Sequence, residues 1–186
     1  MDQDLKGLSD EQLAEMVRNQ DQELYSEIVA RYQEKLLRYA NYLLQERNKA
    51  QDVVQEAFIK AFVNLYGFNT KKKFSSWIYR ITHNEAINYI KKHQKEIPLD
   101  TNHWLANKKD NSNLEEDFHQ KELQQAILAS IKELPIIYRE PLTLYYLEKK
   151  SYNEISDILR LPLGTLSTRI NRAKKYLRKI YENREK

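Results

Sequence analysis

The stretch that decides the fold is KKSYNEISDILRLPLGTLSTRINRAKKYLRKIY, which runs from Lys149 to Tyr181. Ser151 and Glu154 have the spacing of a capping box, in which the serine oxygen accepts the amide of the third helical residue and the glutamate reaches back to the amide of the cap. This pattern predicts a short helix that begins after Ser151 and stops before Pro162.

A second helix follows the turn and has two different faces. Gly164 provides a flexible position in the turn, and Thr165 is predicted to be the N-cap of this helix. Apolar residues recur at steps of three and four and define a buried stripe: Leu166, Ile170, Ala173, Leu177 and Ile180. The residues that point away from this stripe are short and polar first and cationic later: Ser167, Thr168, Arg169, Asn171, Arg172, Lys174, Lys175 and Arg178.

Two helices joined by such a turn form a helix-turn-helix. In a recognition helix of this kind the first residues meet base edges in the major groove, while later lysines and arginines hold phosphates. The order of polar and cationic residues therefore predicts DNA binding. A basic helix that only closes a helical bundle is the alternative that the pattern leaves open.

Composition favours an all-α protein. The 186 residues include only 3 glycines, 31% of them are charged, and aliphatic residues recur at helical intervals. The absence of cysteine excludes disulfides and thiolate metal sites and agrees with a reducing compartment. The acidic N-terminal stretch MDQDLKGLSDEQLAEM has no unbroken apolar run, so we expect no signal peptide, no membrane insertion and a cytoplasmic location. The net charge of +4 is too small to name a partner.

Apolar periodicity divides the chain into two small helical domains joined by a linker. Residues 93–119 are rich in Asn, Asp and Lys and contain Pro98, which is typical of a linker. The domains are therefore expected at residues 1–92 and 120–186. Pro141, inside a helical stretch of the second domain, is expected to kink its helix. Helices are predicted near residues 9–18, 22–44, 48–66 and 74–92, and then near 120–134, 136–148, 152–160 and 165–182.

The predicted helix over 48–66 carries aliphatic side chains on both faces. Its apolar face is formed by Val54, Ala57, Phe58, Ala61, Phe62 and Leu65. On the other face Asp52, Glu56, Ile59 and Val63 follow at steps of four, three and four. Apolar atoms surrounded by charge indicate a protein-binding surface. Packing of Ile59 and Val63 on another helix of the same domain is the alternative.

The predicted helix over 74–92 is basic and rich in aromatic residues. One narrow sector along it combines an aromatic ring, amides and cations: Lys73, Trp77, Arg80, Asn84, Asn88 and Lys91. Such a surface can stack unpaired bases, hydrogen-bond their edges and neutralise phosphates. Trp77 is equally consistent with an anchor in the core.

The sequence offers no catalytic chemistry. It contains no glycine-rich phosphate loop, no nucleophile elbow and no pair of histidines at metal-ligand spacing, so we expect neither an enzyme nor a metal, a cofactor or a small-molecule substrate. The four histidines are scattered: His83, His93, His103 and His119.

Taken in order, these segments resemble the extracytoplasmic-function (ECF) group of bacterial RNA polymerase sigma factors. DVVQEAFIKAF, from Asp52 to Phe62, looks like region 2.2, which in that family docks on the clamp helices of the polymerase. The resemblance implies polymerase contacts from the following residues: Asp52, Gln55, Glu56, Ile59 and Val63. FSSWIYRITHNEAINYIKK looks like regions 2.3 and 2.4, which implies that the sector from Lys73 to Lys91 opens the promoter and recognises its minus-ten element. The loop from Tyr66 to Lys73 corresponds to the family loop that captures a flipped base.

The segment from Leu134 onward is similar to sigma region 4, whose helix-turn-helix recognises the minus-thirty-five element. The resemblance places some residues near bases, namely Thr165, Ser167, Thr168 and Arg169, and others near phosphates, namely Arg172 and Lys175, with Asn171 on the same face. It implies core RNA polymerase and promoter DNA as partners, together with an anti-sigma protein. An ordinary helix-turn-helix regulator is the rival class, but it has no need of a second nucleic-acid stripe on the other domain.

Overall fold

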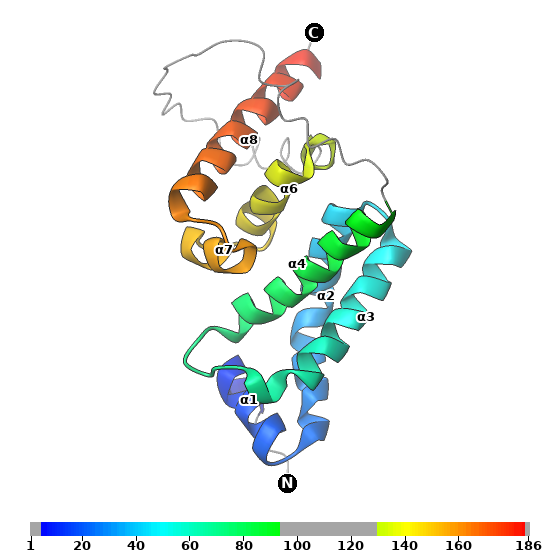
Figure 1. Ribbon diagram of the computed structural model, residues 1–186, viewed down its shortest axis with the longest axis vertical. Helices are drawn as coiled ribbons and strands as arrows, with labels where there is room; N and C mark the ends of the chain where they lie inside the picture. The colour runs from blue at the N-terminus through cyan, green and yellow to red at the C-terminus, as the bar shows by residue number, and fades with distance from the viewer. Residues whose placement is uncertain (1–4, 94–129, 185–186) are drawn as a thin grey trace.

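The computed structural model describes residues 5–93 and 130–184, and over these ranges every regular element is helical (Figure 1). The all-α class predicted from composition is confirmed. The predicted linker from 94 onward, and the part of the predicted helix 120–134 that precedes residue 130, lie outside the described residues. The described helices form two groups, an N-terminal domain with α1 to α4 and a C-terminal domain with α6 to α8 (Figure 1).

The N-terminal domain contains helices α1 (Asp10–Asn19), α2 (Tyr25–Leu44), α3 (Arg47–Val63) and α4 (Phe74–His93). A capping box between Ser9 and Gln12 starts α1, and a left-handed Gln45, with φ of 61°, ends α2 and turns the chain into α3. Two predicted helices are shorter than expected, because the 3₁₀ turn Gln22–Leu24 precedes α2 and the 3₁₀ turn Leu65–Gly67 follows α3.

The C-terminal domain begins with a 3₁₀ turn, η4 (Ile131–Glu133), followed by α6 (Ile136–Leu142). Pro141 lies in α6, where it has no amide to donate, and directly after it the chain widens into a π-helical turn, η5 (Thr143–Leu147). The Glu148 amide donates to the carbonyl of Thr143, five residues back, at 3.2 Å. The helix predicted over 136–148 is therefore divided into an α segment and a π segment.

The helix-turn-helix consists of α7 (Tyr152–Leu159) and α8 (Leu163–Arg184). The predicted capping box is confirmed, since the Ser151 hydroxyl accepts the Glu154 amide and the Glu154 carboxylate accepts the Ser151 amide at 2.9 Å. As predicted, α7 stops before Pro162.

The predicted N-cap of the second helix is wrong. Helix α8 begins at Leu163, directly after Pro162, so Thr165 lies inside its first turn. The left-handed residue of the turn is Arg160, with φ of 52°, and Gly164 has no positive φ. Because the chain reverses at Arg160, the fixed φ of proline can lead straight into the helix.

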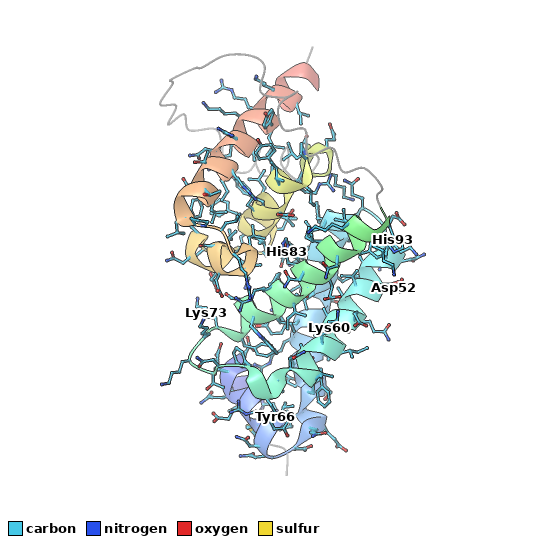
Figure 2. All side chains as sticks on the ribbon, viewed as in Figure 1. Asp52, Lys60, Tyr66, Lys73, His83 and His93 are labelled. Carbon is cyan, nitrogen blue, oxygen red and sulfur yellow. The ribbon has the colours of Figure 1, made fainter. Side chains whose placement is uncertain are left out.

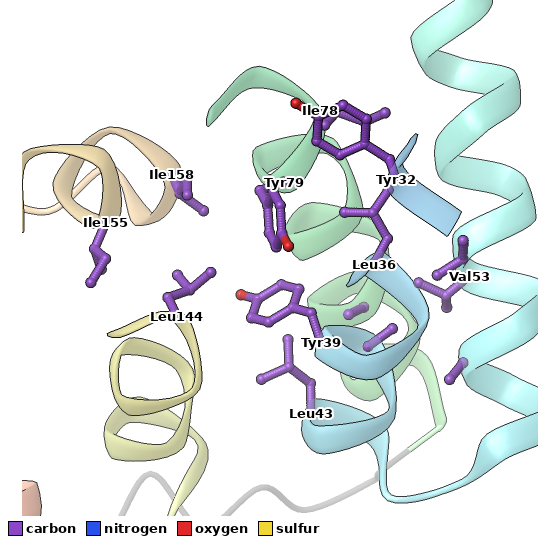
Figure 3. Close-up of a cluster of buried hydrophobic side chains, with 14 of the residues drawn as sticks. Tyr32, Leu36, Tyr39, Leu43, Val53, Ile78, Tyr79, Leu144, Ile155 and Ile158 are labelled. Atoms are coloured by element: carbon purple, nitrogen blue, oxygen red, sulfur yellow. The ribbon is translucent and has the colours of Figure 1, made fainter. Parts of the chain in front are cut away.

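The two domains share a buried apolar contact. Tyr39 of α2 and Tyr79 of α4 are almost inaccessible, and their ring centroids lie 5.6 Å apart. Leu144, Ile155 and Ile158 of the C-terminal domain face these rings across the junction (Figure 3). The buried residues of both domains therefore belong to one continuous cluster.

We expect the substitution Ser151→Ala to lower the free energy of unfolding by about 1 kcal/mol, because α7 loses the acceptor of its capping box. Urea denaturation followed by circular dichroism measures this change. Ser26→Ala is the matched control, since it removes only an exposed hydroxyl bond to the Glu23 carbonyl. Equal losses in both variants would contradict a special role of the cap.

Candidate nucleic-acid interface

The sector predicted from Lys73 to Lys91, which we call the α4 stripe, lies on one side of α4 and is mostly open to solvent. Lys73, Asn84, Asn88 and Lys91 are exposed, whereas Trp77 and Arg80 are half-buried. The residues that the sequence predicted on one side of this helix therefore do lie along one side of α4.

Trp77 combines the two roles considered for it. Its ring packs on Phe68 and Phe74, with centroid distances of 4.9 and 5.5 Å, and so belongs to the edge of the core. The same side chain lines two adjoining hollows of about 370 and 430 Å³, together with Gly67, Ile81 and Asn84. The packed face fixes the ring, and the hollows leave part of it accessible for stacking.

The larger of these hollows has a polar and cationic rim. Asn69, Lys72 and Arg80 line it from the N-terminal domain, and Arg160 lines it from the turn between α7 and α8. The loop beside it is braced internally, since the Asn69 side chain accepts the Lys71 amide at 3.0 Å. An aromatic wall with amides and cations around it suits an unstacked base and its phosphate.

His83 lies near the middle of α4 but outside the stripe (Figure 2). Its Nδ1 atom is 3.0 Å from the hydroxyl of the buried Tyr39. Burial lowers the pKa of His83 to about 4, so the ring is neutral at physiological pH. The structure therefore places this histidine against the buried Tyr39 at the edge of the core.

The outer face of α3 is a second open surface. All five residues that the resemblance assigned to polymerase contacts are exposed: Asp52, Gln55, Glu56, Ile59 and Val63. Ile59 is 51% and Val63 70% exposed, so neither packs inside the described part of the domain. Figure 2 shows Asp52 on the outer side of α3, away from Lys73.

A groove of about 720 Å³ runs between α2 and α3 beside this face. Tyr25, Phe58 and Phe62 line it, with Asp52 and Gln55 at its polar part. Phe62 was predicted on the buried face of its helix, but 38% of the side chain is exposed. The physical reason is that its ring packs edge-on against Tyr25, 4.9 Å away, at the border of the core.

Helix α8 presents the face predicted from its periodicity. Leu166, Ile170, Ala173 and Leu177 are buried, and Ile180 is half-buried. Seven residues were expected to contact DNA: Thr165, Thr168, Asn171, Arg172 and Lys175 are exposed, and Ser167 and Arg169 are half-buried. Arg169 of this face and Lys91 of the α4 stripe both favour the charged form of Glu140, so these two cations lie near the same acid.

Sequence reasoning missed the acids that meet the α4 stripe. Lys73 and Arg80 form ion pairs with Glu154 and Asp157 of the C-terminal domain, at 3.1 and 3.2 Å. Although burial favours the neutral acid, hydrogen bonds from Ser151 and Lys73 hold the pKa of Glu154 at about 2. These partners are about eighty residues apart in sequence, and no local pattern could have paired them.

The described residues contain neither a candidate metal cluster nor a candidate membrane-spanning helix. Within residues 5–93 and 130–184, His, Asp and Glu side chains form no cluster of three or more that could hold a metal ion. No helix in the same ranges is long and apolar enough to cross a membrane.

The geometry defines an all-helical protein with a helix-turn-helix and a second, aromatic surface suited to nucleic acid. Two family descriptions match the chain, Sigma-70 region 2 over residues 28–96 and Sigma-70, region 4 over residues 124–177. The ECF RNA polymerase sigma factor SigW of Bacillus subtilis is 34% identical over 171 residues, which cover 88% of this chain and 91% of that protein. The ECF RNA polymerase sigma-E factor of Haemophilus influenzae is 33% identical, over 91% of this chain and 94% of its own.

Solved structures agree on the fold. CnrH, in a structure described as its complex with the cytosolic domain of CnrY, superposes with a TM-score of 0.70 at 21% identity, covering 94% of this chain and 97% of that one. The chain belongs to the ECF RNA polymerase sigma factors. It is a transcription initiation factor that directs RNA polymerase to promoters.

The pKa of His83 generates a prediction about stability. Because the folded-state pKa lies below the ordinary value of 6.5, the unfolded chain binds the proton more readily, and His83 lowers the stability as pH falls from about 6.5 to about 4. Burial raises the pKa of Glu140 to about 7, which acts in the opposite direction over an overlapping range.

The His83 contribution is therefore measured as a difference between two proteins. We expect His83→Gln to gain stability relative to wild type as pH falls from 7 to about 4, measured by urea denaturation at each pH. The exposed His93→Gln is the matched control. A difference that stays constant with pH would contradict the burial of a neutral His83.

Proposed function

We propose that the α4 stripe holds the non-template strand of the opened promoter and recognises the minus-ten element. The observation that carries this proposal is the half-open ring of Trp77, fixed by Phe68 and Phe74 and bordered by Asn84 in two hollows. Stacking on the ring, hydrogen bonds from the amides of Asn84 and Asn88, and charge neutralisation by the cations offset the cost of unstacking a base. The cations are Lys73, Arg80 and Lys91.

The outer face of α3 is proposed as the docking surface for core RNA polymerase. Its support is the exposure of Ile59 and Val63 among Asp52, Gln55 and Glu56, beside the groove between α2 and α3. Exposed aliphatics next to acids provide apolar contact area, and the charges favour one orientation of the partner.

Helix α8 is proposed to read the minus-thirty-five element in the major groove. Its first turns offer Thr165, Ser167, Thr168 and Arg169 for base edges. Farther along the helix, Arg172 and Lys175 face the phosphates, and Asn171 lies on the same face. Residues 1–92 would then form the polymerase and minus-ten domain, 93–119 the linker and 120–186 the minus-thirty-five domain.

We further propose that the chain performs no catalysis itself and acts in the cytoplasm, where the polymerase that carries out the chemistry is found. An anti-sigma protein is proposed as a regulator. Structures of the similar proteins are described as complexes of CnrH with CnrY and of the sigma factor RpoE from Bartonella quintana with the anti-sigma factor NepR.

The promoter role is tested by run-off transcription with core polymerase. We expect Trp77→Ala and Asn84→Ala each to reduce initiation about ten- to a hundredfold, because each removes a contact to an unstacked base. Asn19→Ala, at the exposed end of α1, is the matched control. Full activity of both variants, or tight binding of the wild type to a palindromic duplex without polymerase, would favour an ordinary regulator instead.

Polymerase docking is tested by titrating core enzyme with labelled protein. We expect Ile59→Asp to weaken binding about tenfold or more, since it places a charge in the centre of the apolar contact. Leu163→Asp is the matched control, because Leu163 is 48% exposed but lies on the C-terminal domain. Similar losses in the two variants would show that α3 is not the docking surface.

A further inference from the structure

Helix α4 begins without a capping residue of its own. The residue before it is Lys73, whose side chain has no acceptor, and the first turn of α4 contains no acid. The Phe74 amide instead donates to the Glu11 carboxylate of α1 at 2.8 Å, across 63 residues of sequence. An acceptor at this place satisfies an amide that has no partner within the helix, and its negative charge suits the helix dipole. The first turn of α4 is therefore held from another helix.

Helix α1 also holds the other end of the loop that leads into α4. Arg18, in the last turn of α1, donates from Nη1 to the Phe68 carbonyl at 3.4 Å. Phe68 and Phe74 flank the loop over residues 69–73, and their ring centroids lie 5.3 Å apart. Both rings also pack on Trp77. The two contacts from α1 therefore end on the two residues that fix the Trp77 ring.

The loop between these two residues borders the larger hollow beside Trp77, which Asn69 and Lys72 line. Within the loop the Lys72 amide donates to the Asn69 carbonyl at 2.9 Å, which shapes the turn but does not tie it to the rest of the domain. The bonds at Phe68 and Phe74 tie the ends of this turn to α1. The position of the loop relative to the Trp77 ring therefore depends on α1.

Helix α1 is itself firmly placed, because one of its faces is buried in the core. The Asp10 carboxylate accepts bonds from two residues of α2, the Tyr32 hydroxyl and, at 2.9 Å, Nη1 of Arg31. The Tyr32 ring in turn packs against Phe74, with the centroids 5.7 Å apart. Since Glu11 follows Asp10 directly, these contacts limit how far the Glu11 carboxylate can move from the Phe74 amide.

We propose that Glu11 is a positioning residue for promoter opening. It fixes the first turn of α4 and, together with Arg18, holds the loop over residues 69–73, so that the hollow beside Trp77 is formed before an unstacked base arrives. This inference rests on the function proposed for α4. A loop that is already ordered does not have to be ordered on binding, and this strengthens the binding of the base. Helix α1 contains none of the residues expected to contact DNA or polymerase, and it acts on the promoter through α4.

The effect on Trp77 is measured first, without DNA. The chain has two tryptophans, so Trp104→Phe leaves Trp77 as the reporter in the full-length protein. In this background we expect Glu11→Ala to raise the constant for fluorescence quenching by acrylamide about twofold, because the first turn of α4 and the loop can then move away from the ring. Glu11→Gln keeps an acceptor oxygen for the Phe74 amide and should stay near wild type.

Glu23→Ala is the matched control, since it removes the same charge at an exposed position after α1. Arg18→Ala is a second variant, which releases the loop at Phe68 and tests the inference even where Glu11→Ala folds poorly. We expect it to raise the quenching constant as well. Quenching constants of Glu11→Ala and Arg18→Ala that equal the constant of Glu23→Ala would overturn the inference.

Initiation is then measured by run-off transcription with core polymerase, and a double substitution shows whether Glu11 acts through Trp77. We expect Glu11→Ala to lower initiation about tenfold relative to Glu23→Ala. In a Trp77→Ala background the same change should lower initiation less than about twofold, because the ring that Glu11 helps to place is absent. Equal fold losses in the two backgrounds would overturn the inference, since a general loss of stability acts whether or not Trp77 is present.

The same proteins separate this inference from the proposed function. If Trp77→Ala initiates as well as wild type, the role proposed for α4 fails, and positioning by Glu11 fails with it. If Trp77→Ala is impaired while Glu11→Ala matches Glu23→Ala, the function proposed for α4 stands and positioning by Glu11 fails.

Discussion

Helix α4 packs against the N-terminal domain on one side, contacts the C-terminal domain on another and stays open to solvent on a third. The arrangement of the other helices depends on this constraint. Phe74, Ile78 and Ile90 bury one side of it against the N-terminal domain. Tyr79 supports the contact with the C-terminal domain through its ring and its hydroxyl. Only the strip between these two sides can remain open, and Asn84 lies on it. The nucleic-acid surface proposed for α4 lies on a helix that is packed on two sides, so it is rigid before a ligand arrives.

Much of the fold could be predicted from sequence where local chemistry determines it. Ser151 and Glu154 specify the start of α7 through side chains three residues apart, and the structure has both hydrogen bonds. The turn that follows was assigned to Gly164, since glycine is the residue that usually adopts positive φ. It is Arg160 that does so, held by bonds from its own amide and from the Leu161 amide to the Ser156 carbonyl. No sequence pattern indicates that an arginine will adopt the left-handed backbone conformation.

The open faces could also be predicted, because helix periodicity alone determines which side chains point outward. This holds for Ile59 and Val63 on α3 and for Thr168 on α8. Periodicity could not reveal which charged residues form ion pairs within the protein. From the sequence, Glu148 would be expected to lie on the surface. Its side chain is instead almost fully buried against Arg38, 110 residues away in the sequence. Pairings of this kind depend on how two domains meet, which no local window contains.

The π-helical turn at Thr143–Leu147 determines where Glu148 points. Its bonds run five residues back, so the segment holds one residue more than an α-helical turn would. If the same residues continued in α form, Glu148 would be rotated by about 100° around the axis. The carboxylate would then leave Arg38 and Tyr79, although no residue of the contact had been replaced. The wider turn after Pro141 is therefore itself a structural requirement of the contact between the two domains.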